Sequence, residues 1–298
     1  MNEHQELRRA LQGVLGAEVV ELEPVRGGDV NDAYRAWTAE DRSVFVKTSP
    51  RAPAGSLRAE ADGLAWLASA GAIALPSVVA VVDGPDDRLR ALVLDWIEAA
   101  APAHDFDEQL GAGLAALHSS GAPRFGVEPD PDGGSQPGFL AGLALSNRPC
   151  DTWAEFYVTR RLEPLLRDAI DAGRLPRSLA GRFGRLFERM HDLAGDPEPP
   201  ARLHGDCWAG NVMADERGAP CLVDPAPYGG HREIDLAMLR LFGGAGGRVF
   251  EAYELHSPLA EGWRDRVALN QLWPLLVHVV LFGGGYADAL ERALGAYV

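Results

Sequence analysis

Hydrophobic and polar residues alternate over several short segments in the N-terminal third of the chain, a pattern typical of strands with one buried face. Turn sequences such as RGGD at 26–29 and ED at 40–41 separate the first of these segments. Neighbouring strands are therefore expected to pair antiparallel in one small sheet. The predicted strands are 18–25, 31–39, 43–49, 77–83 and 90–97.

Helical spacing marks the remaining elements. The segment 56–70 has one apolar face, formed by Leu57, Ala61, Leu64 and Leu67, and Gly71 follows as a stop signal. The first residues also follow an amphipathic helical pattern. A long connection at 121–150, rich in Gly, Pro and Asp, is predicted to be irregular. Further helices are predicted at 106–119, 151–172, 176–194, 233–242, 246–255, 262–282 and 285–297.

The change from strands to helices predicts an α+β protein with two lobes. We expect an N-lobe at 1–97, made of an antiparallel sheet and one helix across it, and a mostly helical C-lobe at 98–298. A hinge is expected near 95–100. Ligands commonly bind where two such units meet, so the junction is the expected site.

Composition and charge narrow the range of partners. With 298 residues and 47% hydrophobic content, the chain can bury a sizeable core. A formal net charge of −15 argues against nucleic acid or an anionic membrane as a partner, and it suits a cationic ligand. The three cysteines lack metal-site spacing, and we find neither a signal peptide nor an apolar run of about 18 residues. A cytoplasmic location is expected.

The segment 203–224, LHGDCWAGNVMADERGAPCLVD, concentrates polar residues around a turn. Asp206 lies five residues before Asn211, and Asp224 ends the apolar run that follows. Carboxylate and amide oxygens are ligands that Mg²⁺ prefers. The same residues could also form a polar hairpin, so the rest of the chain has to distinguish the two interpretations.

Further residues upstream favour the chemical interpretation. Of the 28 Lys and Arg residues, Lys47 is the only lysine, on an apolar strand where arginine could have served as a mere surface cation. Gly27 and Gly28 form a turn between strands, and Glu60 lies in the next helix. Phosphoryl transfer uses each of these types: glycine backbone N–H groups and a lysine at phosphates, a glutamate holding the lysine, and Asp and Asn at Mg²⁺. Taken singly, each has an ordinary structural explanation.

Several motifs carry a resemblance to a known family. They are GGDVNDAY, FVK, HGDCWAGN, DPAPYGGHREIDLAM and LFGGGY. In these motifs the chain resembles the fructosamine kinase (ketosamine-3-kinase) family, which is related to aminoglycoside phosphotransferases and to protein kinases. The resemblance extends over about 18–290 and implies a bilobal protein-kinase-like fold that uses ATP and Mg²⁺.

The resemblance also implies roles for individual residues. Asp206 would be the catalytic base, Asn211 and Asp224 the Mg²⁺ ligands, and Lys47, paired with Glu60, the phosphate contact. The backbone from Asp95 to Ile97 would hold adenine, Gly27 and Gly28 would approach the phosphates, and Asp235 would brace the catalytic loop. The chain departs from the usual pattern at Cys207 and Ala209, and at Asp29, where some members carry a cysteine.

The implied substrate is a ketosamine, with a cationic amine and a sugar rich in hydroxyls, either free or on a glycated protein. Trp208, two residues past the base, is the natural aromatic platform for it. His231, Glu233 and His278 are further candidates, although Trp208 and His278 could equally be packing residues.

Other functions stay open at this point. A metal-dependent hydrolase could use His204, Asp206, Asp224 and His231, and a nucleotide-binding pseudokinase would act through partners. Phosphorylation of aminoglycosides or other small molecules is the main alternative among kinases. The identity of the sugar, the hydroxyl that is phosphorylated and the oligomeric state are left open by the sequence.

Overall fold

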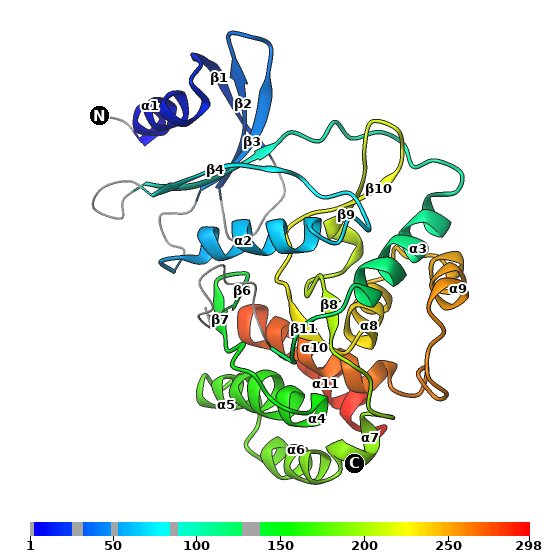
Figure 1. Cartoon of the computed structure of the whole chain (residues 1–298). Coiled ribbons are helices and arrows are strands. Elements are labelled where there is room, and N and C mark those ends of the chain that lie inside the picture. The colour runs from blue at the N-terminus through cyan, green and yellow to red at the C-terminus, as the bar shows by residue number, and fades with distance from the viewer. Residues whose placement is uncertain (1–2, 26–31, 49–52, 84–88, 127–137) are drawn as a thin grey trace.

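The computed structural model describes residues 3–25, 32–48, 53–83, 89–126 and 138–298. Its N-terminal part is a five-stranded antiparallel sheet of order β1-β2-β3-β5-β4 (Figure 1). Each predicted strand is confirmed, with ends shifted by one or two residues. The strands are β1 Val19–Pro24, β2 Asp32–Thr38, β3 Ser43–Thr48, β4 Val78–Asp83 and β5 Arg90–Asp95.

Alternation along β3 separates the two faces of this sheet. Val44 and Val46 are fully buried in a cluster with residues of α1 (Glu3–Leu15), whereas Phe45 and Lys47 point to the opposite face. That opposite face packs against α2 (Ser56–Ala68). One strand therefore builds the core of the sheet with alternate residues and presents the others to a cavity.

The helix α2 forms as its apolar spacing predicts. The predicted face of Leu57, Ala61, Leu64 and Leu67 is buried. Gly71, at φ 60°, follows the helix end and donates its N–H to the carbonyl of Ala68. At Gly63 the helix comes so close to the helical part of the chain that a Cβ would lie 2.6 Å from Pro227.

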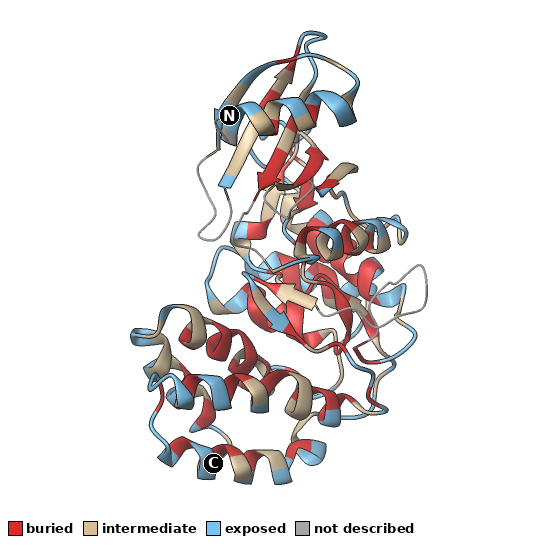
Figure 2. Cartoon of the chain, turned by 90° about the vertical axis from the view of Figure 1, so that its left-hand side faces the viewer, coloured by how far each residue is buried: buried red, intermediate tan, exposed pale blue. Residues whose placement is uncertain are grey.

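The rest of the described chain is mainly helical, and Figure 2 shows buried inner faces and exposed outer faces on these helices. The helices are α3 Phe106–Ser119, α4 Trp153–Phe156, α5 Glu163–Asp171, α6 Ser178–Glu188, α7 Met190–Leu193, α8 Glu233–Leu241, α9 Gly247–His256, α10 Val267–Phe282 and α11 Gly285–Leu294. A π-helical turn, Tyr157–Leu162, joins α4 to α5, so the helix predicted at 151–172 is present with one irregular segment.

Two predicted helices differ from the structure. The helix expected at 262–282 begins only at Val267, because Gly262 adopts φ 75° and single turns follow it. The helix expected at 176–194 is two helices, since the backbone of Arg189, at φ −104° and ψ 2°, leaves the helical conformation.

Short strand pairs complete the helical part. β8 Ala201–Leu203 pairs with β11 Tyr228–Gly230, and β9 Val212–Ala214 pairs with β10 Pro220–Leu222. The connection predicted to be irregular contains a hairpin of β6 Gly138–Leu140 and β7 Leu143–Leu145, whose turn residues Ala141 and Gly142 have φ 47° and 83°. Within the described segments we find no helix long and apolar enough to cross a membrane.

A close helix crossing in this part gives a test of the packing. Gly111 of α3 lies against the backbone of α9, where an added Cβ would be 2.9 Å from the Tyr253 nitrogen and closer still to the Val249 carbonyl. We expect Gly111→Ala to lower the free energy of unfolding by about 1–3 kcal/mol in denaturant titrations, because the two backbones have to separate. Gly181→Ala in α6 has no atom within 4 Å of the new Cβ, and it should raise stability by about 0.5–1 kcal/mol. Equal effects of the two substitutions would contradict the packing.

Candidate functional site

A cavity of about 1010 Å³ lies between the sheet and the helical part. Its walls come from β3, α2, the segment after β5, the β6–β7 hairpin, the 206–227 segment and the ends of α8, α10 and α11. The sequence placed the expected site at this junction, and this cavity is found there.

Lys47 is the centre of an ion network at the inner wall. Its Nζ donates to Glu60 Oε1 and Oε2 at 2.9 and 2.8 Å and to Asp224 Oδ1 at 3.0 Å. Burial alone would lower the pKa of Lys47, but the carboxylates of Glu60 and Asp224 outweigh it and raise that pKa. A buried ammonium is held here because two carboxylates surround it, one from each part of the chain.

The polar segment 203–224 brings its predicted residues together. Asn211, in a short 3₁₀ turn (Ala209–Asn211), donates from Nδ2 to Asp206 Oδ2 at 2.8 Å and to the Asp206 carbonyl at 3.0 Å. The carbonyl of Asn211 accepts from the N–H of Val223 at 3.0 Å, which brings Asp224 alongside. Asp224 itself has φ 52°, a conformation uncommon for a residue other than glycine.

Asp235 fixes this loop from below. Its buried carboxylate accepts from the backbone N–H groups of His204 and Gly205 at 2.7 and 3.0 Å, and it lies 3.2 Å from His118 Nε2. Gly205 has φ 80°, and a Cβ there would collide with the Ala226 backbone. The position predicted to brace the loop therefore does so, and the residue before Asp206 is confined to glycine.

Asp206 sits in a poorly solvated, electronegative position. Burial raises its pKa to about 7, helped by the negative charges of Asp224 and Asp235 and opposed by the hydrogen bond from Asn211. Such a carboxyl is poised to accept a proton near neutral pH.

Asn211 and Asp224 offer a donor set that suits Mg²⁺. The Asp224 side chain is 47% exposed to the cavity, against 11% for Lys47, so its carboxylate has room for a cation. No group of three His, Cys, Asp or Glu residues in the described chain could hold a metal by itself. Mg²⁺ often takes one or two protein oxygens and completes its shell with water and phosphate, which these two residues allow.

The residues predicted to hold adenine line the cavity. Asp95 is the last residue of β5, Trp96 and Ile97 follow it, and the Asp95 carboxylate is engaged by Arg42 at 3.0 Å. Apolar side chains of Phe45 and Met213 face the same space. The predicted phosphate-turn residues Gly27 and Gly28, and also Asp29, lie outside the described residues.

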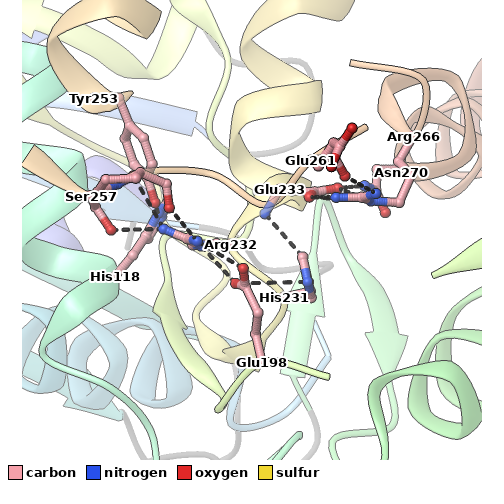
Figure 3. A network of polar contacts seen from close by, with 11 residues as sticks. His118, Glu198, His231, Arg232, Glu233, Tyr253, Ser257, Glu261, Arg266 and Asn270 are labelled. Atoms are coloured by element: carbon pink, nitrogen blue, oxygen red, sulfur yellow. Dashed lines mark hydrogen bonds and ion pairs between the residues drawn. The ribbon is translucent and has the colours of Figure 1, made fainter. Parts of the chain in front are cut away.

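Two of the four substrate candidates line the cavity and two do not. Trp208 is 37% exposed, and its ring covers Gly210, where a Cβ would collide with it. His278 lines the same cavity. His231 and Glu233 instead belong to a separate network shown in Figure 3.

That network explains why His231 and Glu233 lie outside the cavity. Glu233 is buried and accepts from Arg266 Nη2 at 2.6 Å and from Asn270 at 3.1 Å, so its charge is already compensated. His231 lies 3.8 Å from Glu198 and lines a second cavity of about 480 Å³. Neither side chain reaches the cavity that holds Asp206.

The positions of the histidines also exclude the metal-dependent hydrolase considered from the sequence. His204 is buried, with Nε2 3.1 Å from the Val223 carbonyl and Nδ1 accepting from the Asp206 N–H at 3.3 Å. Because both ring nitrogens are engaged and His231 lies elsewhere, the four residues of that hypothesis do not converge on one metal position.

His278 is held as a hydrogen-bond acceptor toward the cavity. Burial lowers its pKa, so the ring is neutral at pH 7, and Nδ1 lies 2.8 Å from the Pro274 carbonyl. A carbonyl only accepts, so Nδ1 carries the proton and Nε2 has the free lone pair.

Sequence reasoning missed several aromatic residues that line the cavity. They are Phe139 of the β6–β7 hairpin, Phe242, Phe282 and Tyr286. A signal was present, because Leu-Phe-Gly-Gly occurs twice, at 241–244 and 281–284, each time where a helix ends. Large apolar residues beside such helix breaks are often partly exposed, and Phe242 and Phe282 are partly exposed here.

Comparison with solved structures shows which fold the chain has. A crystal structure of a thermostable mutant of aminoglycoside phosphotransferase APH(4)-Ia superposes with a TM-score of 0.61, at 15% identity, over 97% of this chain and 96% of its own. At that identity the likeness concerns the fold alone. The α+β architecture is thus that of bilobal protein-kinase-like phosphotransferases.

The family follows from more similar proteins. The sequence model of the fructosamine kinase family matches residues 3–298. A probable ketoamine kinase of Thermus thermophilus is 37% identical, covering 92% of each chain. A crystal structure assigned as a fructosamine-3-kinase of Thermobifida fusca is 39% identical, with a TM-score of 0.86 over 97% of each chain. The chain belongs to the fructosamine kinase family, and it is therefore a phosphotransferase, with the use of ATP that kinases imply.

The ion network around Lys47 gives a test of this wall of the cavity. Lys47→Arg keeps the charge, but a broad guanidinium cannot replace an ammonium held within 3.0 Å of two carboxylates. Loss of one charged hydrogen bond corresponds to a roughly 10- to 100-fold fall in kcat/KM for ATP, measured by steady-state kinetics. Arg248→Lys, at a 61% exposed side chain, is the control and should change little. Near-wild-type kinetics of Lys47→Arg would remove Lys47 from the site.

Proposed function

We propose that the protein transfers the γ-phosphoryl group of ATP to a sugar hydroxyl of a ketosamine, in the cavity between an N-lobe (1–97) and a C-lobe (98–298). One observation carries the proposal. The Lys47–Glu60–Asp224 network and the Asp206–Asn211 pair face one cavity, in the arrangement that phosphoryl transfer requires. Family membership supports a ketoamine as the acceptor.

On the nucleotide side, Lys47 pairs with the α- and β-phosphates and is kept in place by Glu60. The backbone of Asp95–Ile97 holds adenine, and Gly27 and Gly28 are proposed from the sequence alone to approach the phosphates. Asn211 and Asp224 would hold Mg²⁺, which neutralises phosphate charge in the transition state. Asp224, whose carboxylate also accepts from Lys47 at 3.0 Å, would supply an oxygen ligand to the cation.

On the acceptor side, Asp206 accepts the proton of the attacking hydroxyl while that oxygen bonds to the γ-phosphorus and ADP leaves. Asn211 keeps the Asp206 carboxylate oriented through its 2.8 Å hydrogen bond. Trp208 offers a flat face to the sugar or the ammonium, and His278 offers Nε2 to a hydroxyl or N–H.

The proposed role is the removal of sugar adducts from amines, that is, deglycation repair, with phosphorylation as its first step. A pseudokinase commonly lacks the base or a metal ligand, whereas this chain carries Asp206 for the first role and Asn211 and Asp224 for the second. Aminoglycoside phosphorylation rests only on a shared fold at 15% identity. ATP consumption assayed against synthetic ketosamines and aminoglycosides separates these activities, and turnover restricted to aminoglycosides would overturn the proposal.

The sharpest test of the catalytic assignment is Asp206→Asn. The near-isosteric amide keeps the loop but cannot accept the proton, so we expect kcat on a ketosamine to fall by about 10²–10⁴. ATP affinity, measured by calorimetry on the same variant, should be little changed because the phosphates are held by other residues. Asp168→Asn, at an exposed position on α5, is the control. Full turnover, or a joint collapse of kcat and ATP affinity, would show that Asp206 is not the base.

The metal assignment predicts that ATP binding depends on Mg²⁺ through Asp224. In the wild type, adding Mg²⁺ should tighten ATP binding, and in Asp224→Ala this gain should fall by roughly tenfold or more, because a ligand is lost. Glu216→Ala, in the exposed β9–β10 turn, should keep the whole gain. An ATP dissociation constant of Asp224→Ala equal to that of the wild type at saturating Mg²⁺ would count against Asp224 as a ligand.

A further inference from the structure

Four rings form a continuous wall on the acceptor side of the cavity, and we call Phe242, His278, Phe282 and Tyr286 the aromatic wall. Ring centroids of Phe242 and His278 are 4.7 Å apart, and those of His278 and Tyr286 are 4.8 Å apart. Phe282 lies 6.2 Å from Tyr286. The wall thus joins the ends of α8 and α10 to the start of α11.

The wall is connected to the reacting centre. Trp208, two residues after Asp206, packs edge-on against Phe242 with 5.9 Å between centroids. A ligand whose hydroxyl reaches Asp206 can therefore also contact Trp208 and the wall.

The wall is also unusually exposed for its composition. Phe242 is 37% exposed and Phe282 is 50% exposed, although both rings are apolar and face a cavity. Contiguous exposed apolar surface of this kind commonly marks a ligand site. A flat or aliphatic group would cover these rings and remove them from water.

Charge is absent from this wall. The charged side chains that line the described cavity belong to other walls, namely Lys47, Glu60, Asp62, Asp95, Asp206 and Asp224. The one cation among them is already bound by two carboxylates. Burial lowers the pKa of His278 and outweighs the hydrogen bond from Nδ1 to the Pro274 carbonyl, which raises that pKa, so the ring is mainly neutral at pH 7. A carboxylate placed at the wall would meet no cation there, and the carboxylates on the other walls of the described cavity would repel it.

We propose that the aromatic wall is the subsite for the substituent on the ketosamine nitrogen, and that it selects uncharged alkyl or aryl substituents over those with a carboxylate one carbon from the nitrogen. This inference rests on the proposed function. The ammonium itself is compatible with the wall, since aromatic faces attract cations.

The test compares two ketosamines of the same sugar, one made from benzylamine and one from glycine, with purified full-length protein at saturating ATP. We expect kcat/KM to favour the benzylamine compound by roughly tenfold, the scale of one aromatic contact. Phe282→Ala should reduce this ratio toward one, mainly by raising KM for the benzylamine compound. Phe282→Leu, which keeps apolar volume at a half-exposed position, should give an intermediate ratio.

Leu255→Ala is the matched control, because Leu255 is 80% exposed on α9 and does not line the cavity. Its ratio should equal that of the wild type. Equal kcat/KM for the two compounds in the wild type, or an unchanged ratio in Phe282→Ala, would overturn the inference while leaving the proposed function intact.

Calorimetric binding of the same two compounds separates the inference from the proposed function. If neither compound is phosphorylated, the proposed function fails. The assignment of the aromatic wall as a subsite is then supported if the benzylamine compound binds more tightly and Phe282→Ala removes that preference. The assignment is overturned if the two compounds bind alike.

Discussion

The ammonium of Lys47 is taken out of water and held between Glu60 and Asp224 at 2.8–3.0 Å, and the geometry of the cavity depends on this contact. Glu60 belongs to α2 and Asp224 to the helical part, so one cation connects the two parts of the molecule. Removing either carboxylate would leave a buried charge with incomplete compensation, which is costly. The same contact explains why one lysine persists in a chain whose other basic residues are arginines, since a compact ammonium fits between two carboxylates at this distance.

The rest of the site is arranged to keep the polar groups around this contact satisfied. Alternation along β3 puts Val44 and Val46 in the core and leaves Lys47 facing the cavity. Below the loop, Asp235 accepts two backbone N–H groups, so the turn that carries Asp206 is fixed without any contact to a ligand. Preorganised polar groups of this kind lose little freedom when a substrate binds.

The cavity is chemically asymmetric, and the asymmetry matches the two substrates proposed for it. Acidic and cationic groups gather around Lys47, Asp206 and Asp224, where a metal, phosphates and a proton have to be handled. Aromatic rings without charge form the wall that begins beside Trp208. Polar chemistry and apolar recognition are thereby separated along one continuous space.

The sequence by itself determined those features that depend on neighbouring residues. The strands, the buried face of α2, and the spacing of Asp206 and Asn211 across one short turn are local patterns, and the structure reproduces each of them. Only the tertiary structure decided which distant residues meet. His231 and Glu233 look like candidates beside the motif, yet Glu198, Arg266 and Asn270 draw them into a separate network. Phe282 and Tyr286 were not singled out by the sequence, yet they lie on the two sides of the break after α10 and both line the cavity. Hydrophobic periodicity reports whether a residue is on a buried face, but the contacts that compete for a side chain come from elsewhere in the chain and leave no local signature.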